Sequence, residues 1–150
     1  MLFDPENSII KLCAKGIEKE GENLHSEAAQ LFQQAWSEAR NNFEKYIAAH
    51  YLARQQKSTK EKLDWDKVAL DFALLVEDDE VKSSLPSLYL NIAKGHEDLG
   101  DVTQANENYR LALSFEKFLL NDGYGQLILS GIKAGLNRTL ESISKNQEPK

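Results

Sequence analysis

Apolar residues recur at intervals of three and four along most of this chain, and no stretch alternates between apolar and polar residues as a β-strand does. Near the C-terminal end, for example, Ile128, Ile132 and Leu136 follow one another at the spacing of one helix face, with Lys133 on another side. The pattern predicts an all-α fold of seven helices in antiparallel pairs, the last of which is unpaired and covers about residues 126–144.

Short polar or glycine-containing segments separate the apolar stripes and predict the helix ends. They are residues 20–23, 40–42, 57–62, 77–80, 100–101 and 121–125. The lysine-rich segment 57–62 is expected to be a long polar loop. Asp4-Pro5 and Leu85-Pro86 each predict the start of a helix, because proline fits the first helical turn. Asp101, with Gln104 three residues later, resembles a capping box.

The clearest internal pattern lies in the predicted third helix pair. It reads Tyr89-x2-Ile92-Ala93-x2-His96, then Gly100-Asp101, then Ala105-x3-Tyr109-x2-Ala112-Leu113. Small residues at fixed positions of both helices let two backbones approach closely, while the large residues fill the space between them. This arrangement predicts a tightly packed helical hairpin.

Two further segments carry weaker versions of the same pattern. The first reads Ile10-x2-Cys13-Ala14-x2-Ile17, Gly21, then Ala28-x3-Phe32-x2-Ala35, and the middle one reads Ala49-x2-Leu52-Ala53, then Ala69-x3-Ala73-x2-Val76. Together the three copies resemble the tetratricopeptide repeat (TPR) family. The resemblance implies a TPR-like α-α superhelix in one domain, residues 1–150, with helical hairpins at about 7–40, 43–77 and 86–118 and a capping helix at 126–144.

The same resemblance implies where a partner binds, since the first helix of each TPR hairpin lines a concave groove. The positions that correspond to groove residues are Lys11, Lys15, His50, Tyr51, Arg54, Leu90, Asn91 and Lys94. They suggest a locally basic groove that holds an acidic peptide or a free C-terminal carboxylate. The alternative is that these cations are ordinary surface residues, such as any helix in water carries.

Composition narrows the classes of partner. The net charge of −6 argues against a nucleic-acid partner, because nucleic-acid-binding proteins present basic surfaces. Cys13 is the single cysteine, which excludes an internal disulfide and predicts a buried thiol. The first residues lack the features of a signal peptide, and no apolar run reaches the roughly 18 residues of a membrane span. We therefore expect a cytoplasmic protein with no membrane partner.

Motifs of known enzymes are missing from the sequence. It has no glycine-rich phosphate loop, no His-Glu-x-x-His and no Gly-x-Ser-x-Gly, and Gly123-Tyr124-Gly125 is expected to be a helix-helix turn. The three histidines are far apart and predict no metal site. The motifs for the methyl donor and the adenine are also missing, which makes an rRNA methyltransferase activity improbable. The sequence thus predicts no enzyme and no cofactor.

Three hypotheses follow for function. The first is a protein-protein interaction module, or adaptor, that binds a peptide or protein segment in the groove. The second is self-association into a homodimer through the end repeats. The third is an enzyme or a small-ligand-binding regulatory subunit, whose pocket would use His50, Tyr51 and Arg54.

Overall fold

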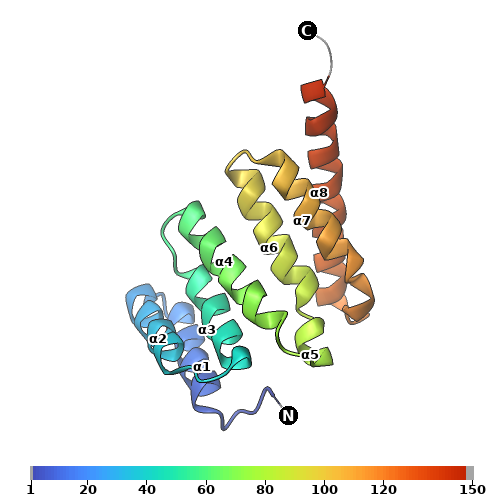
Figure 1. The fold of residues 1–150 in the computed structure, drawn as a ribbon. Coiled ribbons are helices and arrows are strands. Elements are labelled where there is room, and N and C mark those ends of the chain that lie inside the picture. The colour runs from blue at the N-terminus through green and yellow to red at the C-terminus, as the bar shows by residue number, and fades with distance from the viewer. Residues whose placement is uncertain (1, 148–150) are drawn as a thin grey trace. The chain divides into compact units, whose positions relative to one another are not determined.

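The computed structural model describes residues 2–147, and every regular element in that range is helical. The helices of this range that are longer than one turn are labelled in Figure 1: α1 (Ser8–Gly21), α2 (His25–Glu38), α3 (Asn42–Arg54), α4 (Thr59–Ala73), α6 (Leu85–Asp98), α7 (Val102–Ser114) and α8 (Gly123–Gln147). The single turns α5 (Asp79–Lys82) and η1 (Glu116–Phe118) lie between them. The predicted all-α class is confirmed.

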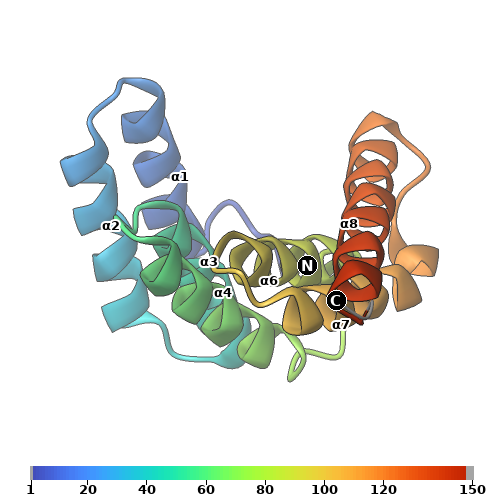
Figure 2. The same ribbon diagram turned by 90° about the horizontal axis from the view of Figure 1, so that it is seen from above.

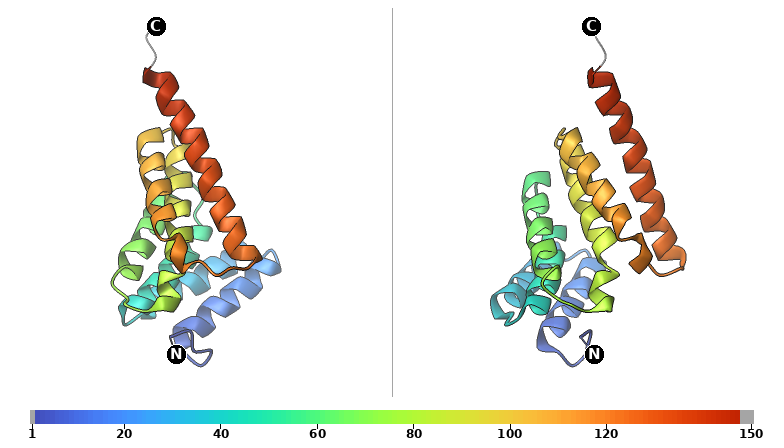
Figure 3. Two further views of the ribbon diagram at one scale, coloured as in Figure 1. Left: turned by 90° about the vertical axis from the view of Figure 1, so that its right-hand side faces the viewer. Right: turned by 45° about the vertical axis from the view of Figure 1, so that its right-hand side comes forward.

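The chain forms two compact units, residues 1–76 and 77–150, and each is described by itself. In the first unit α1 packs against α2 and α3 against α4, while α3 also contacts α1 and α2 (Figure 2). In the second unit α6 packs against α7, and α8 covers both helices. Figure 3 shows α8 extending beyond the ends of α6 and α7. Within residues 2–147, no helix combines the length and the apolar character needed to cross a membrane.

Side-chain caps fix most helix starts, as the polar breaks predicted. The carboxylate of Asp101 accepts the backbone N–H of Gln104 at 3.2 Å, so the expected cap of α7 is present. Asp4 and Pro5, however, do not begin a helix. The backbone oxygen of Asp4 accepts the N–H of Asn7 in a turn, and Asn7 itself caps α1 through the N–H groups of Ile9 and Ile10.

Three predicted loops are shorter than expected, because a cap converts part of each into helix. The Ser58 hydroxyl accepts the N–H of Glu61, so residues 59–62 form the first turn of α4. Asp78 caps the short α5 within the acidic segment. Asp122 accepts the N–H of Gly125 at 2.7 Å, and the predicted turn at residues 123–125 is the first turn of α8.

The α6–α7 hairpin packs at the predicted positions. Ala93, Ala105 and Ala112 are completely buried, and Tyr109 fills the space between the helices. The tight turn before α7 places Gly100 at a φ of 84°, a conformation that favours glycine. In the middle hairpin the corresponding predicted positions, Ala49, Leu52, Ala53, Ala69 and Ala73, are also buried.

The α1–α2 hairpin uses a different register from the one expected. Ala14 and Ile17 are exposed, whereas Gly16 is buried against the ring of Phe32. A Cβ atom at Gly16 would lie 2.2 Å from this ring, so the close approach of α1 and α2 requires glycine there. Gly16 and Ala28 are twelve residues apart, as are Ala93 and Ala105, so the two hairpins have the same spacing between their close-packed small residues.

Candidate functional site

Of the eight predicted groove residues, five belong to the first unit and three to the second. Lys11 and Lys15 are both exposed on α1. The Lys11 ammonium lies 2.8 Å from the Glu6 carboxylate, in an ion pair that solvent screens because both side chains are more than half exposed. No carboxylate of the described part of the chain lies within ion-pair distance of Lys15. Lys15 is therefore available to a charged partner.

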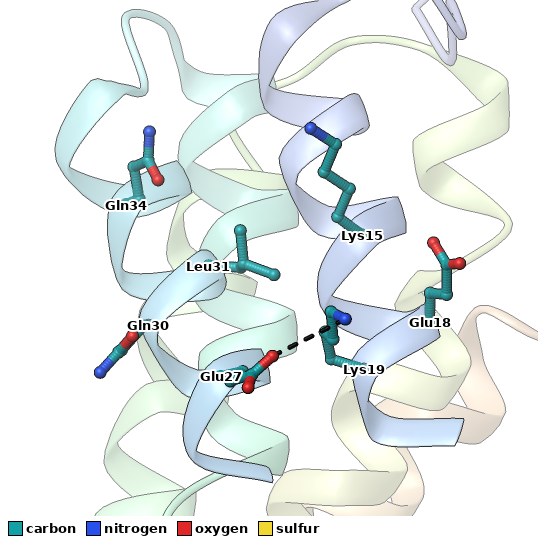
Figure 4. Close-up of a pocket in the computed structure, with 7 residues that line it drawn as sticks. All are labelled: Lys15, Glu18, Lys19, Glu27, Gln30, Leu31 and Gln34. Carbon is teal, nitrogen blue, oxygen red and sulfur yellow. Dashed lines mark ion pairs between the residues drawn. The ribbon is translucent and has the colours of Figure 1, made fainter. Parts of the chain in front are cut away.

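An open groove of about 660 Å³ runs between α1 and α2 beside Lys15. Its lining residues are Lys15, Glu18, Lys19, Glu27, Gln30, Leu31 and Gln34. Figure 4 shows Leu31 pointing from α2 toward α1, with Lys15 and Gln34 toward one end of the groove. At the other end the Lys19 ammonium lies 3.7 Å from Glu27 and joins the two helices. Two lysines and two glutamates leave the lining without net charge.

His50, the first predicted site residue on α3, is largely enclosed. Its Nδ1 atom is buried and has no hydrogen-bond partner, and its ring lies edge-on to Tyr51 with centroids 5.0 Å apart. Burial, together with the positive charges of Arg54 and Lys62, lowers the pKa of His50 to about 4. The side chain is consequently neutral at pH 7 and does not contribute a positive charge to a groove.

Arg54 and Tyr51 lie together in the last turns of α3, but Arg54 already has a carboxylate partner. Its Nη2 atom is 3.0 Å from Oε1 of Glu20, and the amide of Gln55 donates to Oε2 of the same carboxylate. The guanidinium carbon of Arg54 lies 5.4 Å from the centre of the Tyr51 ring, which stacks on Phe32. The predicted cation therefore joins α3 to α1.

Sequence reasoning missed the polar residues that surround these positions. Asp66 is buried on α4, where burial raises the pKa of its carboxyl even though the Lys62 ammonium lies 2.7 Å away. The spacing of Lys62 and Asp66, four residues apart on one helix, is a signal that could have found this pair. Glu20 and Arg54 are far apart in sequence, and no local pattern links them.

The three predicted residues of the second unit do not form a free basic surface. Leu90 is partly buried against the core residues Ala93, Ala105 and Tyr109 and lies 3.4 Å from the position of a Cβ atom on Gly131. Asn91 is partly buried. Lys94 is exposed, and its ammonium lies 2.9 Å from Asp98, one helical turn later. The chain's own carboxylates thus already pair with Lys11, Arg54 and Lys94.

A second polar network, which the sequence did not predict, joins the three long helices of the second unit. The Tyr109 hydroxyl donates to Glu97 at 2.6 Å, and the Arg138 guanidinium contacts both oxygens of Glu97, at 2.8 and 3.0 Å. The hydrogen bond from Arg138, opposed by burial but reinforced by Tyr109, lowers the pKa of Glu97 to about 2. Because each group in the network has partners, we assign it a structural role in attaching α8.

Residues 2–147 contain no group of three or more His, Cys, Asp or Glu side chains placed to hold a metal ion. Cys13 is buried on α1, and burial raises the pKa of its thiol to about 12, as for a thiol that packs as a small apolar residue. Comparison with known proteins adds no further assignment, because no family model, no curated protein and no solved structure matches this chain.

Proposed function

We propose that this protein is an interaction module that binds a peptide or protein segment, and that the α1–α2 groove receives it. The observation that carries the proposal is the combination of side chains in that groove. An apolar side chain, Leu31, lies between the helices, while the amide of Gln34 and the unpaired ammonium of Lys15 lie toward one end.

These three side chains match the groups of an extended peptide. An apolar side chain of the partner packs on Leu31, the amide of Gln34 bonds its backbone, and a carboxylate contacts Lys15. The carboxylate belongs to an acidic side chain or to a free C-terminus. At physiological salt, charges more than about 8 Å away are largely screened. A bound carboxylate therefore interacts more strongly with the Lys15 ammonium beside it than with the net charge of −6 of the whole molecule.

The shape of the groove favours a chain over a compact metabolite. Small-molecule sites usually enclose most of their ligand's surface, whereas this groove is largely open to solvent. TPR-like proteins are in general binding modules, and the resemblance of residues 7–118 to that family agrees with the same class of function. We infer an adaptor that lacks catalytic activity and functions in the cytoplasm.

The proposal is tested by affinity capture from the native lysate, with wild-type protein and two double variants immobilised. The groove variant is Lys15→Glu with Gln34→Glu, which places two negative charges at one end of the groove. The control is Lys67→Glu with Gln33→Glu, the same change of charge at exposed positions outside the groove. Circular dichroism establishes that all three proteins keep their helix content.

We expect a partner that wild type and the control retain and the groove variant loses by tenfold or more. The partner's binding segment, made as a synthetic peptide, then binds in a titration and loses affinity when its carboxylate is replaced by an amide. Equal capture by the groove variant and the control would show that the segment binds elsewhere on the protein.

A second candidate function, self-association into a homodimer, is favoured by one observation in the second unit. Leu120, Tyr124 and Leu127 have exposed fractions of 68%, 63% and 69%, and the last two lie three residues apart on α8. Exposed apolar side chains grouped in this way are typical of protein interfaces. A measurement of the oligomeric state of the protein tests whether these residues form the interface of a homodimer.

A further inference from the structure

The charged side chains of the α1–α2 groove are unevenly distributed along it. The ammonium of Lys15 lies toward one end and that of Lys19 toward the other (Figure 4). Three carboxylates belong to this second end, which we call the acidic end: Glu18 and Glu27 line the groove, and Glu22 lies 3.2 Å from the Lys19 ammonium. Three carboxylates and one ammonium leave two negative charges in excess there, although the lining as a whole is neutral.

Lys19 is committed mainly to Glu22 and leaves the other two carboxylates available. Its ammonium donates a hydrogen bond to Glu22, and this bond is the largest cause of the raised pKa of Lys19. The distance of 3.7 Å between the ammonium and Glu27 is too long for a hydrogen bond. No cation of the described part of the chain lies within ion-pair distance of Glu18. The Glu27 side chain is 56% exposed and Glu18 is also exposed, so a partner can reach both.

We infer that the segment bound in the groove carries a cationic side chain, Lys or Arg, which binds to Glu18 and Glu27 at the acidic end. This inference rests on the function proposed above and adds a second charged position to the partner. Charges of opposite sign across an interface favour the correct partner, and like charges exclude others. The groove is therefore complementary to a segment with opposite charges at its two ends, and not to a uniformly acidic segment.

The length of the groove determines how far apart the two charges of the partner lie. Gln34 lies with Lys15 toward one end and Glu27 belongs to the other. These two residues of α2 are seven positions apart, which is about 10 Å along a helix. An extended peptide covers that distance in about three residues. Because Leu31 lies between the ends, we expect a cation and a carboxylate about three residues apart, with an apolar residue between them.

Fluorescence anisotropy with synthetic peptides tests the inference. The probe is Gly-Gly-Lys-Gly-Leu-Glu, labelled at its N-terminus and free at its C-terminus, and in two companion peptides Ala or Glu replaces the Lys. We expect wild type to bind the Lys peptide about three- to tenfold more tightly than the Ala peptide, as for one or two exposed ion pairs. The peptide with Glu in place of Lys should bind most weakly, because its added carboxylate faces the acidic end.

Two further peptides identify the carboxylate that Lys15 contacts. A C-terminal amide of the probe keeps only the carboxylate of the Glu side chain, and Gly in place of this Glu keeps only the free C-terminus. The peptide that retains the affinity of the probe contains the carboxylate that binds.

Protein variants show whether the preference for a cation arises at the acidic end. Glu18→Gln with Glu27→Gln removes both carboxylates and should bind the Lys and Ala peptides equally. The control, Glu61→Gln with Asp71→Asn, makes the same change of charge at exposed positions of α4 and should keep the wild-type preference. If circular dichroism shows that the first double variant is not folded, Glu27→Gln is used alone, with Glu61→Gln as its control.

The outcomes separate this inference from the function on which it rests. Equal binding of the Lys and Ala peptides by wild type, or a preference that Glu18→Gln with Glu27→Gln retains, would overturn the inference and leave the proposed function in place. If wild type binds none of the peptides, the inference fails together with the proposed function. Sedimentation of wild type and of the same double variant then shows whether a second copy of the chain occupies the groove instead.

Discussion

Buried polar side chains in the first unit differ in how completely their hydrogen bonds are satisfied. Glu44 accepts bonds from the Asn7 amide and from both the backbone and the guanidinium of Arg40. Burial acts to raise the pKa of Glu44, but these bonds lower it below its usual range. His50, in contrast, has a buried Nδ1 atom with no hydrogen-bond partner. Unsatisfied groups of this kind reduce stability and are found at functional sites.

The pH dependence of stability provides a measurement of the burial of His50. Its pKa falls from 6.5 to about 4 on folding, so the unfolded chain binds more protons between these values. We expect the free energy of unfolding to be highest above pH 6.5 and to fall as the pH is lowered toward 4, by at most about 3 kcal/mol from this group.

Urea unfolding of wild type and of His50→Gln, at intervals between pH 7.5 and 4, tests this expectation. The variant has no imidazole to protonate, so the difference in stability between the two proteins should be constant at the upper end of this window and change progressively as the pH falls toward 4. A difference that does not depend on pH would show that water or a carboxylate reaches His50 in the folded protein.

At the scale of the helices, glycines permit the closest contacts between elements. Gly16 lies under the ring of Phe32 in the α1–α2 hairpin, and Gly135 of α8 lies under the ring of Tyr109. A Cβ atom would approach these rings to 2.2 and 2.3 Å, which is far inside van der Waals contact. One glycine thus determines how two elements pack in each unit, and an aromatic ring fills the space that it leaves.

Gly16→Ala tests this packing. We expect it to destabilise the protein by about 1–3 kcal/mol, because α1 has to move away from Phe32. Gly21→Ala is the control, since nothing lies within 4 Å of the added Cβ atom and alanine favours helix. The unfolding temperature of Gly16→Ala should be lower than that of wild type, and that of Gly21→Ala should be equal to or higher than that of wild type. Adding Phe32→Leu to Gly16→Ala places a smaller side chain opposite residue 16 and should recover part of the stability that Gly16→Ala loses. If the double variant recovers none, contact with Phe32 is not the cause of the loss.

For the whole molecule, the open question of self-association rests on the exposed apolar residues at the start of α8. We expect sedimentation analysis of wild type to show a mass that rises with concentration if these residues form a homodimer. Tyr124→Asp with Leu127→Asp should abolish the rise, because a charge at an apolar interface loses its hydration.

Leu140→Asp provides the control, since it places a single negative charge at another exposed apolar position of α8. It lies about 20 Å farther along the helix from Leu127, at 1.5 Å per residue. A monomeric wild type at all concentrations would remove the homodimer from the candidate functions and leave the peptide-binding module as the stronger proposal.

The sequence by itself determined the all-α class and most helix boundaries, because these depend on residues close together in the chain. Apolar spacing specifies a helix, and caps such as Ser58 and Asp101 specify where it begins. The third hairpin was also predictable, since its small and aromatic residues follow a regular pattern. Residues 59–62 and 123–125, which the polar pattern predicts as loop or turn, are helical, because a capping side chain extends a helix into each polar segment.

Only the tertiary structure decided which side chains meet across helices. The register of the α1–α2 hairpin depends on the fit of Gly16 against Phe32, and spacing alone allowed Ala14 in its place. The charge of the predicted groove depends on pairs such as Glu20 with Arg54, which are 34 residues apart. A sequence gives the number of charges but not their distances, and electrostatic energy depends on distance and burial. For that reason the structure corrects the predicted binding residues far more than it corrects the predicted fold.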